Sequence, residues 1–499
     1  MSSLSSLGDR CNPILVREVR QAVRSRGFTG SFVALLSLAV VLTCFLLALH
    51  LEPDRFAGED WMPGPFGGIL FQAVFGCLEL ALLGIVPIGA FMAMSAEWNA
   101  GTWDQLSLSG LTPARIVRGR FLAAGVQAML FSSALVPFLA ACLLLQGLDL
   151  SVMLIGLGWL GLWSPAFTLL AIALGSFNAP RQVRMLLMMV LAAALFGAGM
   201  LMGAFMEQLI DRSSFFSSDE LRYSLIAFAV AAVVVAAYST AGACALLTHP
   251  AENRSSAMRI LTVVVMVMGA SVCGWAYAVE PESFFPYFIA IGGAFAFWIP
   301  AALFSTENEG LSRRVTSRVS PNRILALLSA PFLPGGGRGF LFLLIVLTSY
   351  LALCTAIFAC LPSTSTALPR VGYGCMLGAY LAIVSFTGSH AAFFAFTRRW
   401  VPTRIAAFVS IVFWSTVGTI LHLSFYEFSY RNDYPIWVLI DPFALPVMYW
   451  DRGWHGRAGM EWLFMIMVSA AGVAVALNLP RMSRGIREVL AASAVRRKG

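Results

Sequence analysis

Long apolar runs recur along the whole 499-residue chain, and they constrain its fold more than any other feature. A run of about 18 or more apolar residues is long enough to cross the hydrocarbon core of a bilayer. Backbone N–H and C=O groups inside lipid must be bonded within the chain, so such runs predict helices. The sequence therefore predicts an all-α, polytopic membrane protein with about 12 transmembrane helices. The expected spans are 31–50, 66–95, 121–146, 151–177, 185–206, 223–247, 260–279, 286–304, 339–361, 371–396, 405–424 and 462–480.

Composition excludes a large soluble domain. Hydrophobic residues make up 59% of the chain and charged residues 12%, whereas soluble domains are roughly half apolar and about a quarter charged. The net charge of +8 comes from arginine, because Lys498 is the only lysine. Most of these arginines lie in the segments between spans. We therefore expect the lipid bilayer, rather than a nucleic acid, to be the partner of the basic residues.

The distribution of arginine predicts the topology. Arginines concentrate before the first span, in the 305–338 loop and in the 481–499 tail, whereas the 51–65 segment carries four carboxylates. Short cytoplasmic loops are enriched in Arg and Lys. Both termini are therefore predicted to be cytoplasmic.

The chain has the pattern of a degenerate duplication. A division near residue 250 leaves six spans in each half, and each half has a long basic loop after its second span. Ser95-Ala96-Glu97 in the first loop echoes Ser305-Thr306-Glu307 in the second. Transporters are often built from repeats that are visible mainly in hydropathy. This hypothesis gives a first half at 1–250, a second half at 251–480 and a basic cytoplasmic tail at 481–499.

Sites for metals, cofactors or catalysis are not expected. The nine cysteines and five histidines are dispersed, and no cysteine pair has CxxC spacing. A phosphate-binding loop needs a glycine-rich turn followed by lysine and Ser or Thr. Gly335-Gly336-Gly337-Arg338 lacks the lysine and the spacing, and we interpret these glycines as a flexible approach to the ninth span.

The amino-terminal segment predicts an amphipathic helix. Asn12 is suited to cap a helix and Pro13 to occupy its first turn. Apolar residues at 15, 19, 22 and 23 then share one face, and Arg17, Arg20 and Arg24 share another. Such a helix would lie on the inner membrane surface, either as a simple positive-inside anchor or with a further role.

The loop between the second and third spans predicts a short helix at the cytoplasmic surface. Gly110 is suited to end that helix, and Thr112 with Pro113 is suited to cap and begin the next one. The apolar side chains of this loop need a cover. Lipid, the rest of the chain and a partner protein all remain open as that cover.

These segments resemble the permease subunits of type-2 ATP-binding-cassette (ABC) exporters. The opening element, with Asn12, Pro13, Arg17, Glu18 and Arg20, is similar to the interfacial elbow helix of related bacterial permeases. The loop shares an ordered set of residues with the family's coupling element. These residues are Glu97, Gly101, Thr102, Leu106, Leu111, Thr112, Pro113, Ile116 and Gly119.

The resemblance implies a transmembrane permease in the inner (plasma) membrane of a bacterium. In that family the 97–113 loop would dock on a separate cytoplasmic ABC ATPase, which binds the ATP, and would pass its motion to the spans to export a substrate. This chain would catalyse no reaction itself. A single chain, a homodimer and a pair with a second permease all remain open, and the 307–323 loop lacks the threonine-proline signature.

Glu79 is the clearest ionisable residue inside a predicted span. Charged residues in a bilayer are costly, and they often mark a transport pathway. Glu79 would therefore line a polar pathway or make a structural hydrogen bond within the bundle. The alternative functions are an ion-coupled secondary transporter, for which one acid is thin support, and a membrane scaffold driven by an ATPase.

Overall fold

A computed structural model describes residues 13–51, 66–101, 111–145, 148–211, 219–249, 252–279, 285–307, 310–360, 367–396 and 460–498. The chain divides into two compact units, Met1–Thr248 and His249–Gly499.

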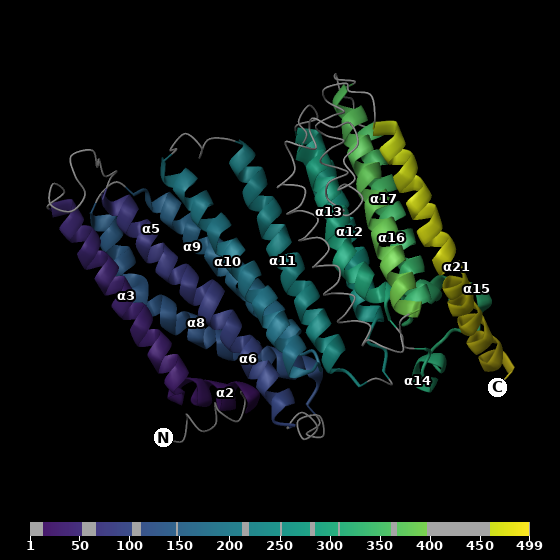
Figure 1. Cartoon of the computed structure of the whole chain (residues 1–499), viewed down its shortest axis with the longest axis horizontal. Coiled ribbons are helices and arrows are strands. Elements are labelled where there is room, and N and C mark those ends of the chain that lie inside the picture. The colour runs from purple at the N-terminus through teal and green to yellow at the C-terminus, as the bar shows by residue number, and fades with distance from the viewer. Residues whose placement is uncertain are drawn as a thin grey trace. The chain divides into compact units, whose positions relative to one another are not determined.

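The first unit is a bundle of long apolar helices with a short helix, α2, lying crosswise at one end (Figure 1). Its elements in chain order are α2 (Pro13–Arg24), α3 (Arg26–Leu51), α5 (Phe66–Glu79), η1 (Leu80–Ile85), α6 (Val86–Asn99), α8 (Pro113–Leu144), α9 (Leu150–Gly175), α10 (Arg181–Asp211) and α11 (Asp219–Leu247). Helix α9 packs against α6 and α11, and α2 packs against α8. Aromatic side chains such as Phe71, Phe75 and Phe131 fill the core.

A π-helical turn, η1, joins α5 to α6 within one continuous span. Val86 N–H donates to the carbonyl of Ala81, five residues back. In this register the carbonyl of Leu82 faces residue 87, which is a proline and has no N–H. The hydroxyl of Ser164 in α9 donates to that carbonyl instead, at 2.9 Å. The proline thus explains why α9 anchors the irregular turn.

The second unit combines long apolar helices with a short-helix segment at one end (Figure 1). Its elements in chain order are α12 (Ser256–Val279), α13 (Phe285–Ser305), α14 (Arg313–Thr316), α15 (Arg323–Ser329), η3 (Ala330–Phe332), α16 (Gly336–Cys360), α17 (Ala367–Phe396) and α21 (Met460–Lys498). Helix α13 packs against α12, α16 and α17. Helix α21 continues past Pro480 to the end of the described chain, and its last turns pack on α15.

The fold confirms an all-α, multi-pass membrane protein. Within the described residues, 11 helices are long and apolar enough to cross a bilayer, and they coincide with predicted spans. The twelfth predicted span, 405–424, lies outside the described residues, as does most of 425–461. Large apolar side chains such as Val41, Phe45 and Met129 are exposed on the outer faces of the helices, as expected of surfaces that contact lipid.

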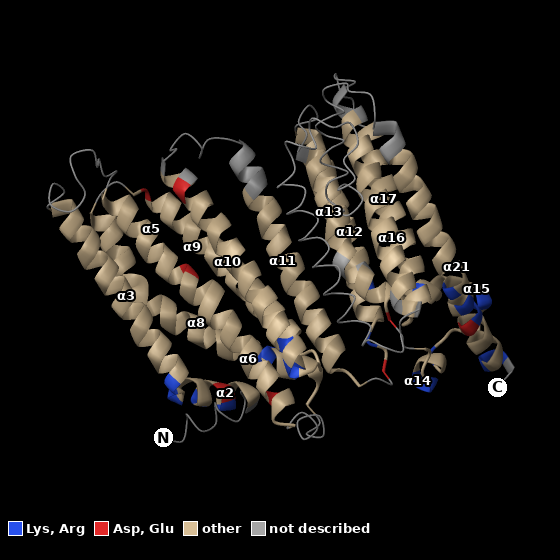
Figure 2. Ribbon diagram, viewed as in Figure 1, with Lys and Arg blue, Asp and Glu red and all other residues tan. Residues whose placement is uncertain are grey.

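Arginines gather at one end of each unit (Figure 2). In the first unit they lie on α2 and at the starts of α8 and α10, and in the second on α14, α15 and the last turns of α21. We call this the arginine-rich end of each unit.

Candidate functional site

Glu97 lies at the arginine-rich end of the first unit, in the last turn of α6. Its side chain is 8% exposed. One carboxylate oxygen, Oε1, lies 3.1 Å from Nη2 of Arg120 in α8 and 3.2 Å from Nη2 of Arg17 in α2. The carboxylate is thus shared by two guanidinium groups from different helices.

Two further contacts extend this cluster. Glu18 of α2 lies 3.6 Å from Nη2 of Arg120, so acidic and basic groups alternate across the α2–α8 contact. Arg184, at the start of α10, donates to the backbone carbonyl of Ser95 at 2.9 Å. The end of α6 is therefore bonded to α2, α8 and α10. We call Arg17, Glu18, Glu97 and Arg120 the Glu97 cluster.

Gly101 ends α6 through its backbone conformation. Its φ is +65°, in the left-handed region that favours glycine, and its N–H donates to the carbonyl of Trp98. A Cβ at this position would meet nothing within 4 Å. Gly101 is therefore required for the turn rather than for close packing.

The start of α8 agrees with the prediction in position but not in capping. The helix begins at Pro113, and Thr112 occupies the N-cap position, but the Thr112 side chain makes no capping hydrogen bond. Thr112 is therefore the N-cap residue, as predicted, but it does not cap the helix through its side chain. Ile116 and Gly119 are buried, and Leu111 packs against the core of the first unit.

The structure brings the predicted elbow helix and coupling element together. Pro13 is the first residue of α2, Arg17 and Glu18 join the Glu97 cluster, and Arg20 is exposed. The remaining predicted site residues lie outside the described residues. They are Asn12, Thr102 and Leu106.

Glu307 occupies a comparable place in the second unit, two residues after α13. Its Oε2 lies 2.8 Å from Nη2 of Arg259 and accepts the N–H of Gly335 at 2.8 Å. Its Oε1 accepts the hydroxyl of Ser255 at 2.6 Å. The side chains of Glu307 and Arg259 are 6% and 0% exposed. Both carboxylate oxygens are therefore bonded in a closed, buried site.

Arg259 links three segments of the second unit. Besides Glu307, its Nη1 donates to the carbonyls of Pro331 and Leu333, at 2.5 and 2.7 Å. The guanidinium also lies over the rings of Phe304 and Phe342, at 5.1 and 5.8 Å from their centroids. Such cation–π contacts add to the ion pair. Arg259 thus joins α12 to the turn before α16.

The glycines at the start of α16 are packed, which shows that the sequence interpretation of a flexible approach to the ninth span is wrong. A Cβ at Gly337 would overlap the backbone carbonyl of Arg481 in α21, and a Cβ at Gly339 would overlap the carbonyl of Phe304 in α13. Gly335 has a φ of +132°. These glycines therefore allow three chain segments to approach closely, and close packing rather than flexibility explains them.

Glu79 is the last residue of α5, directly before the π-helical turn. Its Oε1 is buried and has no hydrogen-bond partner among the described residues. If Glu79 makes a structural hydrogen bond, this oxygen does not make it with any of the described residues.

Comparison of the chain with protein families, with curated proteins and with solved structures finds no match.

Proposed function

We propose that this chain is the transmembrane permease subunit of an ABC transporter, and that it exports a substrate across the inner membrane of a bacterium. It would work with a separate cytoplasmic ATPase that binds and hydrolyses ATP, and would catalyse no reaction itself. The observation that carries the proposal is the Glu97 cluster. It joins the elbow helix, the start of the 97–113 loop and the third span.

The cluster supplies a mechanical route from the loop to the spans. Force applied to the 97–113 loop acts on the end of α6, which is bonded to α2 and α8 through Arg17 and Arg120. Coupling requires an element with two arrangements that a ligand can bias. In this proposal, nucleotide binding by the ATPase provides the bias, and the arginine-rich ends of both units face the cytoplasm.

Purification of the chain with its native partners tests the proposal. We expect a nucleotide-binding protein to co-purify, and its ATPase activity to respond to the permease. Glu97→Gln should reduce that response by about fivefold or more, because typical coupling energies correspond to factors of this size. Arg118→Gln is the matched control, because Arg118 is exposed on the same turn of α8 as Arg120.

Replacement of the whole 97–113 loop should abolish the response while leaving the membrane bundle folded. An unchanged ATPase response after that replacement would contradict the proposal. Co-purification also shows whether one chain, a homodimer or a second permease completes the translocation unit.

A second candidate, an ion-coupled secondary transporter, is favoured by one observation. Glu79 presents a buried oxygen without a partner in the described chain, beside an irregular turn. Such turns occur frequently at functional sites. If an ion gradient drives transport, Glu79→Gln should abolish uptake or efflux in vesicles, and an ionophore should do the same in the unmodified protein. Insensitivity to the ionophore would exclude this candidate.

A further inference from the structure

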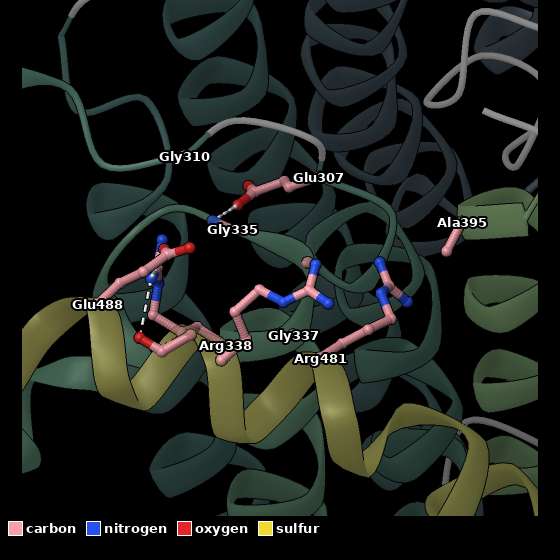
Figure 3. A pocket seen from close by; sticks show the side chains of 11 residues that line it. Glu307, Gly310, Gly335, Gly337, Arg338, Ala395, Arg481 and Glu488 are labelled. Atoms are coloured by element: carbon pink, nitrogen blue, oxygen red, sulfur yellow. Dashed lines mark hydrogen bonds and ion pairs between the residues drawn. The ribbon is translucent and has the colours of Figure 1, made fainter. Parts of the chain in front are cut away.

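A polar pocket of about 230 Å³ lies at the arginine-rich end of the second unit (Figure 3). Its walls come from the end of α13, the start of α16, the end of α17 and the middle of α21. Each of these helices contains a predicted span, so the pocket lies where the spans leave the apolar region. This is the level at which lipid phosphates lie in a bilayer.

The charges that line the pocket do not balance. Glu307 is paired with Arg259, and Glu488 is paired with Arg338 at 3.0 Å. Arg481 and Arg484 also line the pocket, and neither has an ion pair with a carboxylate of the described residues. Because Glu307 is already paired with Arg259 behind the wall, Arg481 and Arg484 give the pocket an excess of positive charge.

Arg481 is held in place by neutral acceptors. Its Nη1 donates to the carbonyl of Ala391 and to Oδ1 of Asn478, both at 2.9 Å, and its Nη2 donates to the carbonyl of Ser305 at 3.3 Å. These bonds fix the guanidinium without neutralising it. Arg484, one turn further along α21, is exposed and keeps its donors available.

The start of α16 adds backbone donors to the same wall. The first N–H groups of a helix have no partner within it. Gly335 and Gly336 donate theirs to Glu307, which leaves the next residues of the first turn beside the pocket. The lack of side chains at Gly336 and Gly337 lets the start of α16 pack closely against Arg481 of α21, which lines the same pocket.

We propose that this pocket binds a phosphate group, and that the phosphate belongs to the headgroup of an anionic lipid. Arginine binds phosphate through paired N–H donors. The volume is smaller than the ~300 to 1,000 Å³ that enclose drug-sized ligands, so a headgroup fits better than a whole cargo molecule. Basic pockets between transmembrane helices are a known type of lipid headgroup site.

Native mass spectrometry of the full chain in detergent tests the proposal. Phosphatidylglycerol is titrated into the protein, with zwitterionic phosphatidylcholine as the lipid control. We expect phosphatidylglycerol to bind preferentially, and Arg484→Gln to weaken that binding about fivefold, the usual contribution of one basic residue near an anionic surface. The double variant Arg481→Gln/Arg484→Gln should weaken it further.

Arg487→Gln is the matched control, because Arg487 is exposed on the same helix but does not line the pocket. This variant should bind phosphatidylglycerol as the unmodified chain does. Arg484 is exposed, so its replacement should leave thermal unfolding unchanged and the binding result interpretable. Equal weakening by Arg484→Gln and Arg487→Gln, or by neither, would overturn the proposal.

Competition with inorganic phosphate distinguishes the two sources of a phosphate group. A lipid site should retain phosphatidylglycerol in a millimolar excess of inorganic phosphate. Complete displacement, with the same dependence on Arg484, would overturn the lipid assignment and assign the pocket to a free phosphate. Binding of neither ligand would overturn both assignments.

Discussion

The Glu97 cluster of the first unit and the Glu307 site of the second use the same residue type at comparable positions. Each glutamate lies at the arginine-rich end of the unit's second span, and each pairs with a buried arginine. They differ in the other partners of the glutamate, because Glu97 also pairs with an exposed arginine. Arg17, which shares Glu97, has a side chain that is 57% exposed, whereas Arg259 beside Glu307 is 0% exposed.

This difference indicates that the ion pairs of the Glu97 cluster can rearrange, whereas those of the Glu307 site stabilise the fold. Glu97 pairs with two guanidinium groups, and Arg120 has Glu18 as a second partner, so the ion pairs can exchange. Glu307 has both oxygens bonded, to Ser255, Arg259 and Gly335. A rearrangement that moves the first loop therefore disrupts little, and one that moves the second breaks a closed set of bonds. This supports the first loop as the coupling element of the proposed permease.

The largest effect is expected for Glu307→Gln. Loss of the negative charge leaves Arg259 buried without compensation, and breaking a buried pair in this way costs about 3–5 kcal/mol. The thermal unfolding midpoint of the purified chain in detergent should fall sharply. A midpoint within error of the unmodified chain would show that the second site is not the more rigid one.

The exposed pair of the second unit provides the control. Arg314 and Glu252 lie 3.4 Å apart, but their side chains are 71% and 53% exposed. Surface pairs of this kind contribute about 0–1 kcal/mol. Glu252→Gln removes the same charge as Glu307→Gln, but from an exposed pair instead of a buried, hydrogen-bonded one.

Much of the fold could be predicted from the sequence because membrane spans are local features. Each described span corresponds to an apolar run in the sequence, and Pro13 and Pro113 mark the starts of α2 and α8. The π-helical turn was not predicted, although Pro87 was its visible signal. Ser164, whose hydroxyl donates to the free carbonyl of this turn, is too distant in the sequence to have been linked to it.

The site was predicted less completely because ion pairs join residues that are distant in the sequence. The sequence marked Glu97 as part of the coupling element, and Arg17 and Glu18 as part of the elbow helix. It did not predict that these residues contact one another. Arg120 and Arg259 lie next to apolar runs, where an arginine ordinarily indicates topology, but both are buried. The sequence beside an apolar run does not show that an arginine is buried, because burial depends on a partner glutamate elsewhere in the chain. That glutamate is 23 residues from Arg120 and 48 residues from Arg259.

An intermediate effect is expected for Glu97→Gln. The substitution removes the shared charge, but Arg17 is half in solvent and Arg120 retains Glu18 at 3.6 Å. We expect a loss of about 1.5–3 kcal/mol, the range for hydrogen bonds to charged groups. Thermal unfolding of Glu97→Gln and Glu307→Gln under identical conditions tests the order. A larger shift for Glu97→Gln would reverse the assignment of open and closed sites.

The smallest effect is expected for Gly101→Ala, which tests the turn that follows Glu97 without touching the ion pairs. The φ of +65° strains any residue with a Cβ, at a cost of about 1 kcal/mol, although nothing lies within 4 Å of the added atom. Gly89→Ala, within α6, is the control, because a Cβ there also meets nothing within 4 Å and Gly89 has no positive φ. It should stabilise α6 by about 0.5–1 kcal/mol. Opposite shifts in the unfolding midpoint would establish that Gly101 acts through backbone conformation, and shifts of the same sign would refute it.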